Sequence, residues 1–202
     1  MFKLVRFFSV TSFVSLVSVA ILLGLFYRYY AIETLVEHGN RENVTVGQVL
    51  SNTMWPQVVL LLEENAEFDK DEQRKNLVLE VRKQIADKAH GLDIAKIKLY
   101  NVKGITVFST EISQIGERQD NNLGLKKAIL GVSSSDFVHK DSFNGLDKVM
   151  ENRDLLQTYM PLFDKNHQSI IGVVEIYSDH TRILAQVNKT QLTMMVGTSI
   201  VL

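Results

Sequence analysis

A long stretch of apolar residues without charge lies near the start of the chain, over residues 7–27 (FFSVTSFVSLVSVAILLGLFY). A helix over that range rises about 31 Å, which is enough to cross the hydrocarbon core of a bilayer. Lys3 and Arg6 precede it, so the positive-inside rule places residues 1–6 in the cytoplasm and the bulk of the chain outside. A cleaved signal peptide would have a shorter apolar core followed by small residues, whereas this run ends in aromatic ones. The pattern therefore predicts an uncleaved transmembrane helix.

The other end of the chain is also uncharged, over residues 191–202 (QLTMMVGTSIVL). A span needs about 20 residues, so this run is too short to cross a bilayer by itself. The simplest interpretation is the truncated start of a second transmembrane helix, which makes the chain a fragment whose continuation returns to the cytoplasm. An ordinary apolar C-terminal tail is the alternative.

Between these ends, apolar residues at helical spacing first predict a long helix over residues 28–64. Gly39 and Asn40 are expected to interrupt it, and Pro56 to end or kink a turn. A second helix is predicted over residues 69–90, with its apolar residues one turn apart at Leu77, Val81 and Ile85. Asp69–Glu72 has capping-box spacing and Gly91 is a natural C-terminal stop.

From residue 97 the apolar positions alternate, which is the pattern of half-buried strands. A hairpin is predicted over residues 97–108 with its turn at 101–104, followed by a polar loop at 111–122 and a short helix at 123–132. Ser133–Ser135 is interpreted as a loop before a strand. The three later strands are predicted at 136–140, 155–164 and 169–179, with Pro161 at an edge or bulge, before a helix from residue 181. Because the strands need no crossover helices, the sheet is antiparallel and the class is α+β.

Charge and composition remove several classes of function. The chain has 22 basic and 23 acidic residues, without the concentrated basic face that nucleic acid binding needs. It has no cysteine, which excludes disulfides, thiolate metal sites and cysteine nucleophiles. Its five histidines lack metal-ligand spacing, and the phosphate-loop and serine-nucleophile motifs are missing. We therefore predict no metal, no cofactor, no catalytic residues and no enzyme.

One strand carries polar side chains in an unusual place. Glu175 and Tyr177 are two residues apart, so they lie on one face of the strand together with Val173, while Val174 and Ile176 lie on the other. A carboxylate among β-branched residues in mid-strand has two interpretations. It contacts a ligand, or this face of an antiparallel sheet is solvated.

Two stretches resemble the single Cache domain, the PAS-like extracytoplasmic sensor of bacterial receptors. Ile97–Thr110 (IKLYNVKGITVFST) is similar to the family's first hairpin, and Tyr159–Asp179 (YMPLFDKNHQSIIGVVEIYSD) to its closing hairpin. The resemblance implies a long N-terminal helix and a five-stranded antiparallel sheet with flanking helices in a domain over residues 28–190. It also implies a location in the bacterial inner membrane, a homodimer packed along 28–64, and a histidine kinase or diguanylate cyclase output that is missing here.

The resemblance implies sensing of a small molecule between the sheet and the 111–140 segment. A small acid would need a cation and hydroxyls that converge in a pocket. The candidate ligand-binding residues are Arg118 and Lys126 in the covering segment, and Tyr159, Glu175 and Tyr177 on the late strands. Apart from membrane lipid, the expected partners are a small-molecule ligand and a second copy of the chain. The alternative function is a membrane-anchored scaffold that binds another extracytoplasmic protein.

Overall fold

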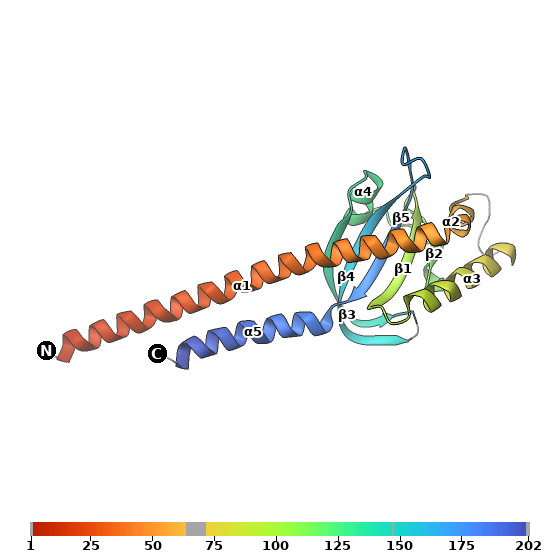
Figure 1. Ribbon diagram of the computed structural model, residues 1–202. Coiled ribbons are helices and arrows are strands. Elements are labelled where there is room, and N and C mark those ends of the chain that lie inside the picture. Colours follow the sequence, from red (N-terminus) through yellow and green to blue (C-terminus); the bar gives the residue numbers. More distant parts are fainter. Residues whose placement is uncertain (1, 64–71, 147, 201–202) are drawn as a thin grey trace. The chain divides into compact units, whose positions relative to one another are not determined.

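The computed structural model describes residues 2–63, 72–146 and 148–200 and confirms the α+β class. Its elements are shown in Figure 1. The helices are α1 (Phe2–Thr53), α2 (Trp55–Leu62), α3 (Glu72–Ala89), α4 (Leu123–Ile129) and α5 (Thr181–Ile200), with a 3-10 turn at Ile112–Gln114. The strands are β1 (Ile94–Asn101), β2 (Thr106–Ser109), β3 (Ser134–Asn144), β4 (Val149–Phe163) and β5 (Ile170–Asp179). They form one five-stranded antiparallel sheet, as predicted, and its strand order is β2-β1-β5-β4-β3.

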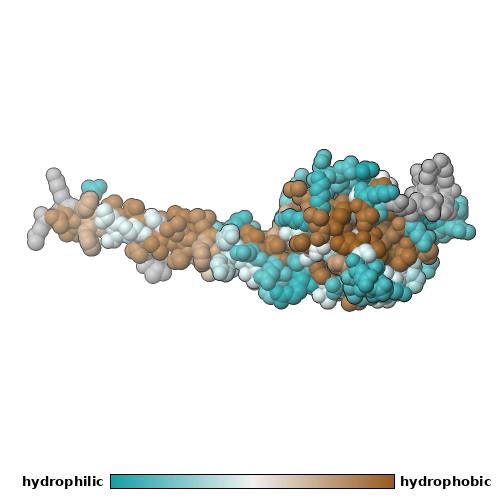
Figure 2. Space-filling view, turned by 90° about the horizontal axis from the view of Figure 1, so that it is seen from above, coloured by the Kyte–Doolittle hydropathy of each residue, from teal (hydrophilic) through white to brown (hydrophobic). Residues whose placement is uncertain are grey.

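The chain divides into two compact units, residues 1–35 with 181–202, and residues 36–180. In the first unit, α1 is long and apolar enough to cross a membrane, with a mean hydropathy of 2.2 over its most apolar window. Its large apolar side chains are mostly exposed, for example Phe7 at 71% and Phe8 at 72%, and they form the apolar surface of this unit in Figure 2. This supports the predicted membrane helix at 7–27. The predicted second membrane segment at 191–202, like the domain limits of 28–190, stays a prediction.

The expected interruption of the long helix at Gly39 and Asn40 is wrong, because α1 runs unbroken to Thr53. Gly39 and Gly47 instead allow the helix to lie close to the sheet. A Cβ on Gly39 would lie 2.3 Å from Leu156 Cδ2, and one on Gly47 would lie 3.0 Å from Met160 Cε. α1 ends at Thr53 and α2 begins at Trp55 with Pro56 in its first turn, so the chain breaks close to the expected position.

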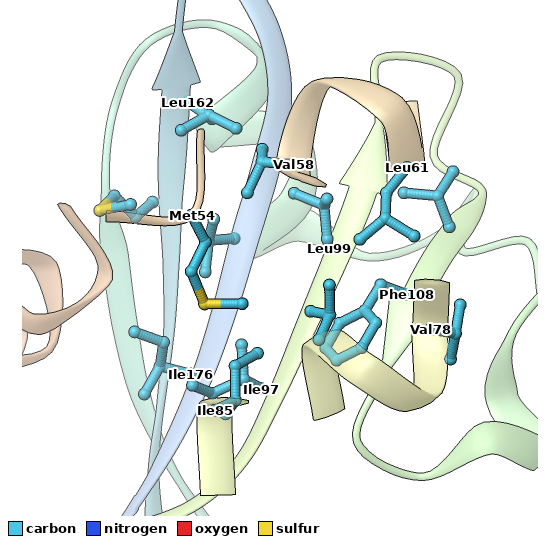
Figure 3. Close-up of a cluster of buried hydrophobic side chains, with 14 residues drawn as sticks. Met54, Val58, Leu61, Val78, Ile85, Ile97, Leu99, Phe108, Leu162 and Ile176 are labelled. Atoms are coloured by element: carbon cyan, nitrogen blue, oxygen red, sulfur yellow. The ribbon is translucent and has the colours of Figure 1, made fainter. Parts of the chain in front are cut away.

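The hydrophobic core lies between one face of the sheet and the layer formed by the end of α1, α2 and α3. Figure 3 shows its buried side chains, which come from α2, α3, strands β1, β2, β4 and β5, and Met54 between α1 and α2. The end of α1 adds the partly buried Val44 and Leu50. Val174 and Ile176 belong to this core, as their alternation in the sequence predicted. The side chains of α4 pack on the opposite face, where Leu125 and Ala128 contact Tyr159. The first face is therefore filled, and the second is only partly covered.

Most limits of the elements follow the sequence. Gly91 and Gly104 have positive φ (84° and 77°) at the predicted end of α3 and in the predicted hairpin turn. The pairing of β3 with β4 ends at Tyr159, so Pro161 lies where that side of β4 is an edge, and the ladder with β5 is irregular one residue later. The capping box at Asp69–Glu72 lies mostly outside the described residues.

Strands β3 and β4 are longer than predicted. They begin at Ser134 and Val149, so the interpretation of Ser133–Ser135 as a loop is wrong for its last two residues. Most of the added residues are polar, with Phe143, Val149 and Met150 as exceptions, and they pair in the outer part of the sheet. Backbone ladder bonds do not require apolar side chains, so the alternation that reveals a half-buried strand was missing there.

Candidate functional site

A cavity of about 370 Å³ opens on the face of the sheet opposite the hydrophobic core. Its walls come from β1, β3, β4 and β5 and from the segment after β2, which is where the sequence predicted a pocket. The lining is almost entirely polar: Lys96, Lys98, Tyr100, Glu111, Gln114, Glu117, Gln119, Asn122, Lys140, Ser142, Phe143, Asn144, Gln157, Tyr159, Glu175 and Tyr177.

The register of three central strands places these side chains side by side. Glu175 in β5 is paired with Lys98 in β1 on one side and with Tyr159 in β4 on the other. Tyr177 is likewise paired with Gln157. Since side chains two residues apart share a face, each strand contributes more than one group to the same cavity.

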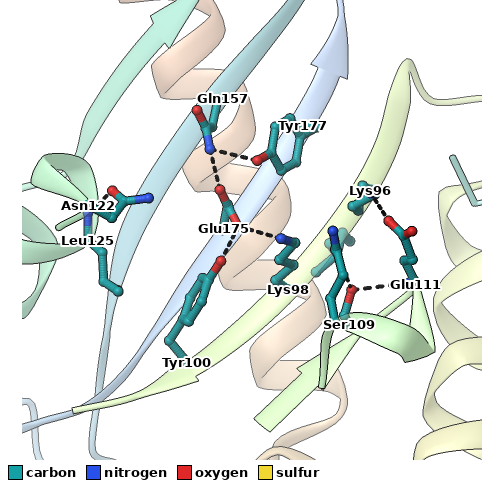
Figure 4. Close-up of polar contacts among 12 residues, drawn as sticks. Lys96, Lys98, Tyr100, Ser109, Glu111, Asn122, Leu125, Gln157, Glu175 and Tyr177 are labelled. Atoms are coloured by element: carbon teal, nitrogen blue, oxygen red, sulfur yellow. Dashed lines mark hydrogen bonds and ion pairs between the residues drawn. The ribbon is translucent and has the colours of Figure 1, made fainter. Parts of the chain in front are cut away.

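The carboxylate of Glu175 is the centre of a buried polar network (Figure 4). The hydroxyl of Tyr100 donates a hydrogen bond of 2.6 Å to Oε2, and the amide of Gln157 donates to Oε1. The ammonium of Lys98 lies 3.9 Å from Oε2. Glu175 is 1% exposed, so the interpretation of this strand face as solvated is wrong.

Three tyrosine hydroxyls surround this carboxylate. The amide nitrogen of Gln157 also lies 2.6 Å from the hydroxyl oxygens of Tyr159 and Tyr177, and Asn122 donates a hydrogen bond to the hydroxyl of Tyr159. Burial, followed by the negative charge of Glu175, raises the pKa of Tyr100, Tyr159 and Tyr177. The three side chains therefore remain neutral hydroxyls, able to donate hydrogen bonds at physiological pH.

A second ion pair lies at the edge of the cavity. Lys96 contacts Glu111, and its ammonium also lies 4.1 Å from the centre of the Phe143 ring. Asn144 donates a hydrogen bond of 2.7 Å to the same carboxylate. Burial lowers the pKa of Lys96. Burial opposes the ionisation of Glu111, but the hydrogen bonds from Lys96 and Asn144 outweigh it and lower the pKa of this carboxyl.

The sequence identified part of this lining. The structure brings Tyr159, Glu175 and Tyr177 together in one cavity, whereas Arg118 and Lys126 are exposed and do not line it. Arg118 pairs with Asp120 at 2.7 Å, and Lys126 lies on α4. The assignment of all five residues to ligand binding stays a prediction.

The lysines of the cavity were missed, although the sequence carries a signal for them. Lys96, Lys98 and Tyr100 alternate with Ile97 and Leu99, which face the core. An alternating strand whose apolar residues are buried must turn its lysines to the other face. Lysine is so often exposed that this pattern is normally interpreted as a solvated surface.

No protein-family model matches the chain, and no curated protein matches it. Among solved structures, it is similar to the periplasmic domain of RsbU from Chlamydia trachomatis, with 16% identity and a TM-score of 0.52 over 89% of this chain and 59% of that domain. The sensor domain of DcuS from E. coli has 18% identity and a TM-score of 0.46 over 74% and 97%. The sensor domain of the V. cholerae histidine kinase DctB has 15% identity and a TM-score of 0.43 over 74% and 60%.

The similarity to the RsbU domain, at this low identity, concerns the fold alone. The chain spans about 59% of the length of that domain. The five-stranded antiparallel sheet with flanking helices is the fold of that periplasmic domain, and it agrees with the fold that the resemblance in the sequence implied.

Proposed function

We propose that this chain is the extracytoplasmic sensing module of a bacterial inner-membrane receptor and that its cavity binds a small molecule with an acidic group. Three observations support the proposal. The fold is that of a periplasmic domain, α1 is long and apolar enough to anchor the chain, and a polar cavity of about 370 Å³ lies on the sheet. The volume is within the range of small-ligand pockets.

The chemical class of the ligand is inferred from the surroundings of the Lys98 ammonium. Its side chain is 7% exposed and lines the cavity, and among the described residues its ammonium has an ion-pair partner at 3.9 Å but no hydrogen-bond acceptor. A buried ammonium without acceptors is costly, and a carboxylate is its best-matched partner. The hydroxyls of Tyr159 and Tyr177 line the same cavity and offer further polar contacts. A ligand with an acidic group therefore matches the cavity.

The signalling step follows from the order of the elements. Glu175 and Tyr177 lie on β5, which ends at Asp179, and α5 begins at Thr181. A ligand that binds one arrangement of β5 more tightly shifts the population of that arrangement, and α5 then carries the shift toward the membrane. We propose that the receptor works as a homodimer packed along α1 and controls a histidine kinase or diguanylate cyclase.

The test uses the full chain in lipid nanodiscs and a panel of small organic acids, amino acids and amines. Binding to the native state raises the melting temperature by mass action. We expect some acids to raise it in the wild type and not in Lys98→Met, which keeps the length of the side chain and removes its charge. Lys127→Met, a change of an exposed lysine on α4, should respond as the wild type does.

Equal shifts in the wild type and in Lys98→Met would reject the site. A wild type that responds to no compound in the panel would reject the small-acid proposal and favour the scaffold alternative.

A further inference from the structure

We propose that Glu111 pairs with Lys96, the second of two neighbouring cations in the cavity, and thereby restricts the site to ligands with a single acidic group. This inference rests on the proposed function, since it concerns the ligand class of the same cavity. It makes Glu111 a specificity-determining residue. Its carboxylate stands where a second acidic group of a ligand would bind.

The two cations are equivalent in position but differ in their partners. Lys96 and Lys98 are two residues apart in β1, line the same cavity, and have side chains that are 4% and 7% exposed. Lys96 donates a hydrogen bond to a carboxylate, whereas Lys98 lies 3.9 Å from the carboxylate of Glu175. That carboxylate already accepts hydrogen bonds from two neutral side chains, Tyr100 and Gln157. Figure 4 shows both lysines with their partners.

The partner of Lys96 comes from outside the sheet. Glu111 lies in the segment that follows β2, where its backbone N–H donates a hydrogen bond of 3.0 Å to the hydroxyl of Ser109. Its carboxylate accepts from β1 through Lys96 and from β3 through Asn144. The side chain is 19% exposed, in contrast to 1% for Glu175, so solvent and a ligand can reach it. It binds the buried ammonium as a ligand carboxylate would.

The consequence is a rule for ligand charge. A ligand with one acidic group binds Lys98 and leaves the Lys96–Glu111 pair intact. A ligand with two acidic groups places its second carboxylate beside Glu111, where it must displace that side chain or be repelled by it. Since a buried ion pair is broken only at a substantial free-energy cost, the monoacid is preferred over a diacid of the same length.

The first experiment asks whether a free carboxylate can replace Glu111. It uses the full chain with Lys98→Met, so that acetate cannot act through Lys98, with and without Glu111→Ala. We expect Glu111→Ala to lower the melting temperature by several degrees, because Lys96 loses its partner. Sodium acetate should restore part of this loss, and sodium chloride at equal concentration should not. Glu117→Ala, a change of an exposed carboxylate lining the same cavity, should show no acetate-specific gain.

The second experiment compares butyrate with succinate, which have the same chain length and one or two carboxylates. Titration calorimetry should show that the wild type prefers butyrate, and that Glu111→Ala prefers succinate by about tenfold or more, the value of one charge-assisted hydrogen bond. Glu111→Gln keeps the shape of the side chain and an acceptor oxygen, and it serves if the alanine variant does not fold. It should weaken the preference of the wild type for butyrate.

The outcomes separate this inference from the proposed function. The inference is overturned if acetate gives no specific gain in Lys98→Met/Glu111→Ala, or if the butyrate-to-succinate ratio is the same with and without Glu111. If the wild type binds neither acid but acetate rescues Lys98→Met/Glu111→Ala, the acid site at Lys98 is rejected. The same result supports the assignment of Glu111 to Lys96.

Discussion

The side-chain amide of Asn43 in α1 donates a hydrogen bond of 2.8 Å to the hydroxyl of Thr158 in β4, across 115 residues of sequence. Thr158 lies between Gln157 and Tyr159, whose side chains line the cavity on the other face of the same strand. The helix that contains the candidate membrane span is therefore hydrogen-bonded to a strand whose opposite face lines the candidate ligand site.

Asn43→Ala should weaken the folded state by about 1–3 kcal/mol, the usual effect of leaving buried hydrogen-bonding groups without a partner. Asn43 is 3% exposed and also donates to the hydroxyl of Ser178 at 2.9 Å, so its loss affects two strands. The change is measured as the shift of the urea unfolding midpoint of the full chain in detergent. Gln48→Ala, an exposed change on the same helix, should stay within about 0.5 kcal/mol. Equal shifts in the two variants would mean that the Asn43 bonds do not stabilise the packing of α1.

Gly39→Ala should lower the melting temperature, although alanine is the better helix former by about 1 kcal/mol. The new Cβ would lie 2.3 Å from Leu156 Cδ2, so the helix or the core side chain must move. The exposed neighbouring substitution His38→Ala also gains helix propensity and meets no such contact, so it should raise the melting temperature slightly or leave it unchanged. A rise in both variants would show that α1 does not lie this close to the sheet.

The sequence predicted those parts of the fold in which buried apolar residues recur at regular intervals along the chain. The alternation of Ile97 and Leu99, and of Val174 and Ile176, predicted strands and the face each residue occupies, because a strand between two environments must alternate. The predicted limits of β3 are wrong because the residues at its two ends are mostly polar and show no apolar alternation. Gly39 was misinterpreted because glycine at a helix packing contact and glycine at a helix break look alike in a single sequence.

The candidate site was predictable where strand spacing alone decides proximity. Glu175 and Tyr177 share a face within one strand, so their common cavity followed from their numbers. The pairing of Lys98 with Glu175, 77 positions apart in the sequence, depends on the register between β1 and β5, and β2, the 3-10 turn, α4, β3 and β4 lie between these strands. Neither charge pattern nor spacing within one strand gives such a register. For this reason the sequence indicated candidate cations only in the covering segment, at Arg118 and Lys126.

The outer part of the sheet should make stability depend on pH. The hydrogen bond between His139 and Asp154, at 2.7 Å, raises the pKa of His139 above its usual 6.5, with a further contribution from Asp141. A pKa that is raised in the folded state gives its full stabilisation below about pH 6.5. This stabilisation is lost as the pH rises through the pKa of the folded state. His139→Gln should therefore flatten the fall in melting temperature between about pH 5.5 and 8.5, most clearly at low salt. Gln48→Ala, an exposed change without a titratable group, should leave the profile unchanged.

The proposed topology places Asn121 outside the cytoplasm, because Lys3 and Arg6 precede the apolar helix. The chain has no cysteine, so Asn121→Cys introduces a single thiol at an exposed position. A membrane-impermeant maleimide should label it in intact cells. A cysteine at residue 2, on the cytoplasmic side, is the control and should react only after lysis. The reverse pattern would overturn the orientation and with it the extracytoplasmic cavity.

Glu175→Ala should weaken the folded state by about 3–5 kcal/mol, because it leaves the buried ammonium of Lys98 without a counter-charge and removes the acceptor of Tyr100. Glu117→Ala is the matched control, since Glu117 also lines the cavity but is exposed, and it should change stability by no more than about 0.5 kcal/mol. Both are measured as shifts of the urea unfolding midpoint. If the two variants were equally stable, Glu175 would lie on a solvated face and the network around it would not exist. If only Glu175→Ala is destabilised, the polar network around Glu175 is part of the fold.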